Sequence, residues 1–110
     1  MADEARWASV PVAMPAEGRV SAFEVEGHEL LLCNAGGEPS VITNQCPHAG
    51  VALAPGVLRG SVLECPFHGG KLDVRTGAPV APPIRRPVRV FPVRQGDAGL
   101  LVQLDPVSGS

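Results

Sequence analysis

The stretch CPHAG, residues 46–50, returns in altered form as CPFHGG, residues 65–70. These two stretches hold two of the three cysteines and two of the three histidines in the 110-residue chain. Cysteine thiolates and histidine imidazoles are ligands of zinc and of iron–sulfur clusters. The near-repeat therefore predicts a metal site that is shared by two short loops.

The candidate ligands are Cys46, His48, Cys65 and His68. A disulfide explains these cysteines poorly, because the number of cysteines is odd and each of the two has a histidine close by. A cysteine nucleophile needs one activated thiol and one base, so two matched Cys/His turns exceed that need. The pattern favours metal binding over both alternatives.

Two kinds of metal centre suit four such ligands. A tetrahedral zinc ion can use two cysteines and two histidines, but ligands only two positions apart reach a single ion awkwardly. A two-iron cluster would let each loop give one ligand to each metal, with the cysteines on one iron and the histidines on the other. The spacing favours the two-iron centre and leaves zinc open as the alternative.

Composition and turn signals predict an all-β fold. Thirteen glycines and twelve prolines are too many for a helical bundle, because both residues break helices. Turn signals recur at the spacing of a small antiparallel β domain. Hairpins are expected to reverse at Glu26–His28, Arg59–Gly60 and Gln95–Gly99, and a further turn is expected within Asn34–Ser40.

Length, charge and hydropathy narrow the classes of function. We expect a single domain over residues 1–110, since this length is close to the commonest domain size. The net charge is −2 and aromatic residues make up 4%, which is too few for a base-stacking platform, so nucleic acid is not an expected partner. No apolar run approaches the roughly 18 residues that span a bilayer. The acidic start also lacks the order of a secretory signal, so we expect a cytoplasmic protein that does not contact a membrane.

Charge is distributed unevenly along the chain. Acidic residues outnumber basic ones from Met1 to Glu38, and basic residues outnumber acidic ones from Arg59 to Arg94. Two ordinary solvated faces would explain this difference. The sharper alternative is a dipolar surface that steers a protein partner into one orientation.

The stretch GAPVAPPIRRP, residues 77–87, follows the second Cys-Pro loop and contains four prolines. Proline lacks the amide hydrogen that a strand ladder needs, so this stretch cannot be a central strand. We expect a stiff, extended loop. It serves either as a plain connector or, as we prefer, as a rigid lid over the metal loops.

The four candidate ligands resemble those of the Rieske family, in which two histidines replace two cysteines on one iron of a [2Fe–2S] cluster. The similarity extends over about Asn44–Gly77 and includes HGGKLDVRTG after the second cysteine loop. It implies one cluster in which Cys46 and Cys65 bind one iron and His48 and His68 bind the other.

The resemblance also implies a fold and a range of redox potential. The family fold is a small antiparallel β-sandwich with two cluster-binding loops, here at about residues 44–84. High-potential members carry two further cysteines, at positions that correspond here to Val51 and Phe67, and a serine and a tyrosine, at positions that correspond here to Gly70 and Leu72. Losing hydrogen bonds to the cluster sulfurs lowers the potential, so we expect a low-potential centre.

The implied function is that of a soluble ferredoxin similar to those of bacterial ring-hydroxylating dioxygenases. Such a carrier takes single electrons from a flavin-dependent reductase to a terminal Rieske oxygenase, and we expect it to act as a monomer. One alternative is the small Rieske-type subunit of a reductase complex, such as nitrite reductase. Another is a zinc-stabilised interaction module, which would be colourless and redox-silent.

The remaining cysteine and histidine have no predicted place at the metal. Cys33 ends the apolar run ELLLC and is expected to be a buried free thiol. His28 is expected to be solvated in a hairpin turn. Catalytic Rieske subunits need a mononuclear iron with two further histidines and a carboxylate, so this chain is not expected to be an enzyme.

Overall fold

The computed structural model describes residues 6–47, 50–54, 56–66 and 69–104, and these residues form strands and turns without any helix. This confirms the predicted all-β class. Accordingly, the described part of the chain contains no helix that could cross a membrane. The strands are β1 (Arg6–Ser9), β2 (Val20–Val25), β3 (His28–Ala35), β4 (Glu38–Thr43), β5 (Val57–Arg59), β6 (Val62–Glu64), β7 (Lys71–Asp73), β8 (Pro79–Ala81), β9 (Val90–Phe91), β10 (Val93–Gly96) and β11 (Gly99–Leu104).

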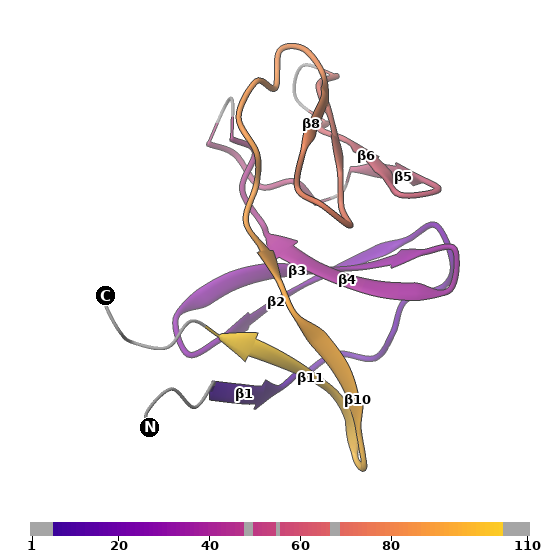
Figure 1. The fold of residues 1–110 in the computed structure, drawn as a ribbon, viewed down its shortest axis with the longest axis vertical. Helices are drawn as coiled ribbons and strands as arrows, with labels where there is room; N and C mark the ends of the chain where they lie inside the picture. The colour runs from indigo at the N-terminus through magenta and orange to yellow at the C-terminus, as the bar shows by residue number, and fades with distance from the viewer. Residues whose placement is uncertain (1–5, 48–49, 55, 67–68, 105–110) are drawn as a thin grey trace.

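The strands form three sheets, with the orders β1-β11-β10, β2-β3-β4-β9 and β5-β6-β7-β8. Every strand pair is antiparallel. Figure 1 shows the sheets one above another, with the sheet of β2, β3 and β4 in the middle. The two lower sheets form the predicted sandwich. Cys46 lies on the connection from β4 to the third sheet, and Cys65 lies between β6 and β7 of that sheet.

The predicted reversals lie between paired strands. Glu26 and Gly27 turn with φ angles of 50° and 82° between β2 and β3, and Gly36 and Gly37 turn between β3 and β4 with φ angles of 68° and 94°. The β5–β6 and β10–β11 hairpins likewise confirm the predictions at Arg59–Gly60 and Gln95–Gly99. The preference of glycine and small polar residues for turns is strong enough that these reversals can be predicted from sequence.

The middle sheet is buried on both faces. Along β3, Leu30 and Leu32 pack with the first sheet, while Leu31 and Cys33 pack towards the third. All four side chains are at most 1% exposed. Residues that alternate between two buried faces must be apolar at every position, which explains the uninterrupted run in this strand.

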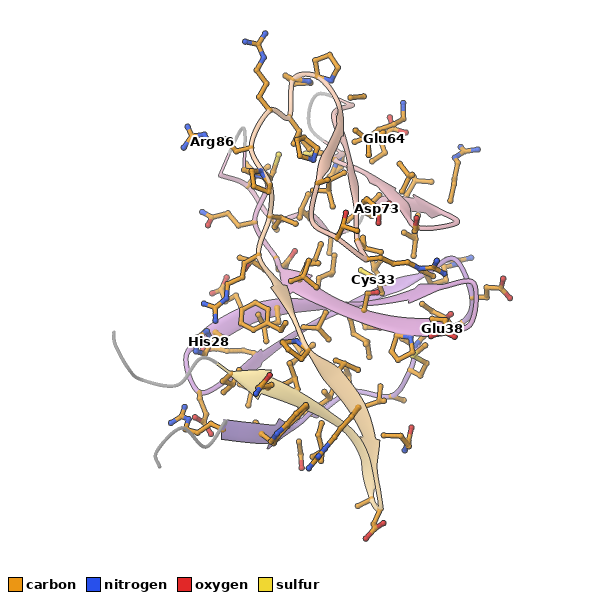
Figure 2. All side chains as sticks on the ribbon, in the orientation of Figure 1. His28, Cys33, Glu38, Glu64, Asp73 and Arg86 are labelled. Atoms are coloured by element: carbon orange, nitrogen blue, oxygen red, sulfur yellow. The ribbon has the colours of Figure 1, made fainter. Side chains whose placement is uncertain are left out.

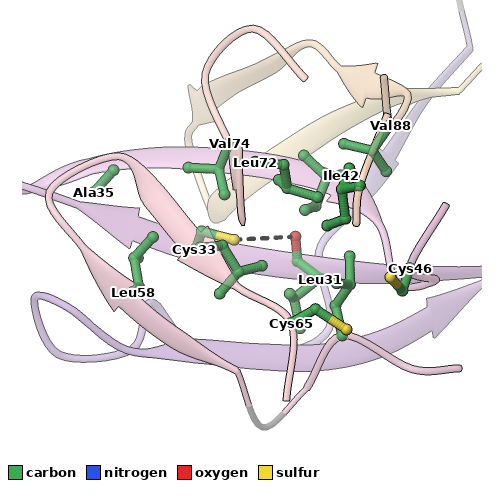
Figure 3. Packing of buried hydrophobic residues seen from close by; sticks show 13 residues of the cluster. Leu31, Cys33, Ala35, Ile42, Cys46, Leu58, Cys65, Leu72, Val74 and Val88 are labelled. Carbon is green, nitrogen blue, oxygen red and sulfur yellow. Dashed lines mark hydrogen bonds between the residues drawn. The ribbon is translucent and has the colours of Figure 1, made fainter. Parts of the chain in front are cut away.

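Two apolar cores lie on the two faces of the middle sheet. The base core lies between the first and middle sheets, and the loop-side core lies between the middle sheet and the third (Figure 3). The base core consists of Ala8, Phe23, Leu30, Leu32, Val41, Phe91, Val102 and Leu104. The loop-side core consists of Leu31, Cys33, Ala35, Ile42, Cys46, Leu53, Leu58, Leu63, Cys65, Leu72, Val74, Ile84 and Val88.

The proline-rich stretch forms a short strand where we expected only a loop. Its residues Pro79–Ala81 make β8, which pairs with β7 through Leu72 and Lys71 across a register shift. β8 is an edge strand, so its one proline, Pro79, needs no amide hydrogen on the open side. The prediction that this stretch cannot be a central strand is confirmed.

Gly77 brings the end of the proline stretch back against the β7–β8 turn. Its φ is +80°, and a side-chain carbon there would overlap with the carbonyl oxygen of Val88. The Val88 N–H donates to the Gly77 carbonyl oxygen at 2.9 Å. The contact requires glycine on two counts, the positive φ and the close approach of another backbone.

Replacing Gly77 by alanine is expected to destabilise the fold more than the same change at Gly27. Both glycines have a positive φ, +80° and +82°, so both variants incur backbone strain of about 1–3 kcal/mol. The new methyl group at Gly27 meets nothing within 4 Å, whereas overlap with Val88 adds about 1–3 kcal/mol at Gly77. Urea denaturation followed by the fluorescence of Trp7, the single tryptophan, compares them, and equal losses would contradict this close packing.

Candidate metal centre

Cys46 and Cys65 come from different hairpins and meet in the loop-side core. Cys46 follows β4, Cys65 follows β6, and each is 2% exposed. Both are free of disulfides, and Figure 3 shows both at the margin of the core. The fold therefore brings together the two cysteines of the predicted ligand set, while His48 and His68 lie outside the described residues.

The two cysteine loops close with the same backbone hydrogen bonds. In each loop the cysteine N–H donates to the carbonyl five positions later, and the cysteine carbonyl accepts from the glycine four positions later. The near-repeat in sequence is thus a repeat in backbone hydrogen bonding, although the histidine stands at a different offset in each loop. The bonds are Cys46 N–Val51 O (2.7 Å), Gly50 N–Cys46 O (2.8 Å), Cys65 N–Gly70 O (2.7 Å) and Gly69 N–Cys65 O (3.2 Å).

Asn44 braces the first loop from inside, a role that the sequence reasoning missed. Its Oδ1 accepts hydrogen bonds from the backbone N–H groups of Leu53, at 2.9 Å, and Ala54, at 3.2 Å. Gln45 adds a bond from Nε2 to the carbonyl oxygen of Gly50, at 3.3 Å. An asparagine beside a loop often caps backbone groups in this way, and that preference was the available signal.

The proline stretch covers the second loop at Gly70. A side-chain carbon at Gly70 would lie 2.7 Å from Ile84 Cγ1 and 3.1 Å from Pro83 Cδ. The preferred prediction of a lid is therefore confirmed for this loop. The packing also leaves no room for a serine hydroxyl at Gly70 unless Ile84 moves, and Leu72 is fully buried without a donor group.

The turn after β7 is fixed by its own polar side chains. The carboxylate of Asp73 accepts the N–H of Arg75 at 2.8 Å and the hydroxyl of Ser61 at 3.3 Å. The Oγ1 of Thr76 accepts the N–H of Ala78 at 3.2 Å. Each polar group is used to fix the turn, as expected for these residue types.

Cys33 is a buried free thiol, as predicted. It is fully buried, and its Sγ lies 4.0 Å from the carbonyl oxygen of Leu31 (Figure 3). Burial raises the pKa of the Cys33 thiol to about 12. Because a thiolate is the form that binds metal or attacks an electrophile, Cys33 is inert at neutral pH.

His28 differs from the expectation of a solvated turn residue. It begins β3 and is half-buried, with its ring edge against Phe91 at a centroid separation of 6.0 Å. The hairpin turn itself falls on the two preceding residues, so the imidazole packs on the sheet. Phe91 is in the base core, which gives His28 a packing role.

The described donors suit a thiolate-bound metal. Over residues 6–47, 50–54, 56–66 and 69–104, no group of three or more His, Cys, Asp or Glu side chains gathers. What does gather is the pair of buried cysteines, each with its backbone N–H and carbonyl hydrogen-bonded within its own loop and neither in a disulfide. Two such thiols at the margin of an apolar core are the half of a two-cysteine, two-histidine set that these residues can supply.

Comparison with known sequences gives the same assignment. Residues 8–92 match the Rieske [2Fe-2S] domain family. The chain is also 39% identical over 90 residues to the ferredoxin component of biphenyl 2,3-dioxygenase from Rhodococcus jostii (strain RHA1), covering 82% of this chain and 84% of that protein. Both matches imply one Rieske-type [2Fe–2S] cluster, which decides against the zinc alternative.

Two solved structures have the same architecture. The ferredoxin of carbazole 1,9a-dioxygenase from Nocardioides aromaticivorans IC177 is 39% identical with a TM-score of 0.75, covering 86% of this chain and 97% of that one. A complex of reduced oxygenase and oxidized ferredoxin in carbazole 1,9a-dioxygenase contains a chain that is 31% identical with a TM-score of 0.80. That match covers 88% of this chain and 92% of the other. The likeness extends over nearly the whole fold.

Gly70→Ala and Ile84→Ala are expected to show strong coupling. Gly70→Ala alone pushes a methyl group against Ile84, and Ile84→Ala alone leaves a cavity that costs about 2–5 kcal/mol. In the double variant the new methyl group enters the vacated space. The loss in unfolding free energy should therefore be about 0.5–3 kcal/mol smaller than the sum of the two single losses.

Urea denaturation of the four proteins in this cycle measures the coupling energy. Gly70→Ala combined with Leu104→Ala is the matched control, because Leu104 lies in the base core and shares no contact with Gly70. That control pair should be additive. Additivity in the Gly70–Ile84 cycle as well would show that the proline stretch does not press on the second loop.

Raising the pH is expected to destabilise the folded protein through Cys33. The pKa of this thiol is about 12 in the folded state against an ordinary 9.0, so between these values only the unfolded chain loses the proton. The free energy of unfolding then falls as pH rises, by up to about 1.4 kcal/mol per pH unit. The difference between wild type and Cys33→Ala, measured at pH 8 and above pH 9.0, isolates this contribution, and an unchanged difference would contradict it.

Proposed function

Because the chain belongs to the Rieske [2Fe-2S] domain family, we propose that it is a ferredoxin that carries single electrons from a flavin-dependent reductase to a terminal Rieske oxygenase. The observation that carries the proposal is its 39% identity to a dioxygenase ferredoxin over 82% of the chain. A carrier of this kind performs no substrate chemistry. It acts, in our proposal, as a cytoplasmic monomer.

We assign the cluster to Cys46 and Cys65 on one iron and to His48 and His68 on the other. When bound, the cluster accepts and releases one electron at a time. Support for the cysteine half is that two buried cysteines, neither in a disulfide, belong to the same loop-side core. Support for the histidine half is the position of one histidine in each of two loops that close alike.

The backbone around each of the two cysteines is fixed by hydrogen bonds. Each cysteine has both its N–H and its carbonyl bonded within its own loop, and Asn44 and Gly70 tie the loops to neighbouring segments. A frame that does not rearrange when charge changes keeps the cost of electron transfer small, for the same reason that preorganised dipoles lower the barriers of catalysed reactions. Rigidity is thus the contribution of the chain to transfer.

The low potential expected from the sequence has support in the packing. Gly70 has no side-chain donor, and Ile84 fills the space where a hydroxyl would stand. Leu72 is fully buried in the loop-side core. With no side-chain hydrogen bond to sulfur from either position, the more negative reduced state is stabilised less and the potential stays low.

The remaining rival is a Rieske-type subunit bound in a reductase complex such as nitrite reductase. Such a subunit would stay with its large partner, whereas a diffusing ferredoxin purifies alone. Size-exclusion chromatography of the untagged protein separates the two ideas. Reconstitution with a flavin reductase and a terminal Rieske oxygenase, with their own ferredoxin left out, tests the carrier role directly.

The ligand set predicts which substitutions abolish the cluster. Cys46→Ala, Cys65→Ala, His48→Ala and His68→Ala should each lose the iron, the sulfide and the rhombic electron paramagnetic resonance signal of the dithionite-reduced protein, because each removes one of four metal bonds. The spectrum of the wild type should have an average g value of about 1.9, as the histidine ligands of this class imply.

Cys33→Ala and His28→Ala are the matched controls, since they change the one cysteine and the one histidine outside the set. Both controls should keep the iron content and the signal. A control that loses the cluster, or a ligand variant that keeps it unaltered, would refute the assignment. Stoichiometric zinc in a colourless wild type would refute the proposed function itself.

A further inference from the structure

A groove of about 260 Å³ opens between the first cysteine loop and the proline stretch, and it is lined by Pro47, Pro83, Arg85 and Arg86. We call it the arginine groove. Pro47 directly follows the ligand Cys46. A molecule seated in this groove would therefore lie beside the loop that holds one of the cluster cysteines.

The two arginines of the groove are exposed, and the described residues offer neither of them a contact partner. Four other arginines do have one. Arg6 pairs with Glu26, and Arg75 donates to the carbonyl oxygen of Ala35. Arg89 and Arg94 stack on aromatic rings, with the guanidinium carbon 4.3 Å and 4.4 Å from the ring centroids. In the described part of the chain, neither Arg85 nor Arg86 has a hydrogen bond or ion pair, so their donors stay available.

The groove is also held rigidly, because buried residues anchor the proline stretch on either side of the arginines. Ile84 is 3% exposed and Val88 is 8% exposed, and both belong to the loop-side core. Pro83 and Pro87 restrict the backbone beside them. Since the two arginines stand on a fixed backbone, little conformational entropy is lost when a partner binds.

The surface next to the groove is apolar. Val80 on β8 is 51% exposed, and it lines a shallow hollow together with Ile84 and Arg85. Charged side chains beside an exposed apolar patch are the usual composition of a protein-docking surface, in which the apolar part supplies affinity and the charges supply orientation and rate. A small-molecule anion would have no use for this apolar flank.

The sign of charge at the groove points to a particular kind of partner. Figure 2 places Arg86 at the end of the molecule where the cysteine loops lie and Glu38 beside the middle sheet, away from that end. On β6 and β7, Glu64 and Lys71 occupy paired positions of opposite charge, whereas in the described part of the chain neither Arg85 nor Arg86 has an ionic partner. The positive field at this end therefore comes from the groove, and it favours a partner that carries carboxylates.

We propose that the arginine groove is the docking site for the electron acceptor of this ferredoxin, and that the acceptor presents Asp or Glu side chains to Arg85 and Arg86. The inference rests on the proposed function, because it concerns the partner in the same electron transfer. The acidic face of the acceptor meets the two guanidinium groups, and its apolar surroundings cover Val80. This orientation brings the acceptor against the first cysteine loop.

Stopped-flow oxidation of the dithionite-reduced holoprotein by two protein acceptors of opposite charge tests the proposal. Cytochrome b5, which has an acidic haem edge, represents the carboxylate-bearing partner, and cytochrome c, which has a basic one, is its counterpart. At low ionic strength, Arg85→Glu/Arg86→Glu should slow the reduction of cytochrome b5 by about tenfold or more, and added salt should remove most of the difference. Reduction of cytochrome c should become faster.

The matched control is Arg19→Glu/Arg59→Glu, which makes the same change in net charge. Arg59 is on β5, at the opposite edge of the third sheet from β8, and Arg19 precedes β2; neither lines the groove. The control should alter both rates by less than about threefold, because the Coulomb interaction weakens with distance and these two arginines lie away from the groove. Equal slowing in the two double variants would overturn the proposal, since only net charge would then matter.

The single variants Arg85→Gln and Arg86→Gln keep the test decisive if the double variant loses its cluster. Each should slow the reduction of cytochrome b5 while its absorption spectrum and reduction potential stay at the wild-type values. Unchanged rates would overturn the docking site and leave the carrier function intact. A wild type that reduces neither cytochrome would instead overturn the proposed function.

Discussion

The structure depends on a middle sheet that is buried on both faces. On one face of β3, Leu30 and Leu32 pack in the base core. On the other face, Leu31 and Cys33 pack in the loop-side core. Two cores on one sheet fix the third sheet against the middle one, and Cys46 and Cys65, which follow β4 and β6, are buried in the loop-side core between them. The meeting of two buried cysteines follows from this double burial, because a strand solvated on one side could not position anything beyond it.

The proline stretch contacts the second cysteine loop on its inner side and forms part of the molecular surface on its outer side. Its inner residue Ile84 presses on Gly70, which excludes a side-chain donor from the second loop. The next two residues, Arg85 and Arg86, face outward at the arginine groove. One rigid backbone therefore sets the apolar lining on one side and the charged rim on the other, so a change in either affects the other. In a carrier, this links the expected low potential to the choice of partner.

Burial and loop geometry together explain why Cys46 and Cys65 suit metal binding and Cys33 does not. Cys33, Cys46 and Cys65 are all at most 2% exposed, so exposure does not distinguish them. Cys33 lies in a regular strand, where the backbone is used by the ladder and desolvation keeps the thiol protonated. Cys46 and Cys65 lie in loops that have their own hydrogen bonds and end at the margin of the core. A ligand needs that second setting, because a metal must be able to reach it.

Sequence alone determined the all-β class, the hairpin turns, the burial of Cys33 as a free thiol and the two cysteine loops, because glycine turns, an apolar run and Cys-Pro-x-x-Gly loops are local features that need no distant partner to be recognised. The cap from Asn44, the pressure of Ile84 on Gly70, the edge strand within the prolines and the packing of His28 on Phe91 were decided by the tertiary structure. Each of these joins residues that are separated in the chain, or depends on which strand lies at an edge. Such contacts follow from how the three sheets stack, and no local pattern encodes that.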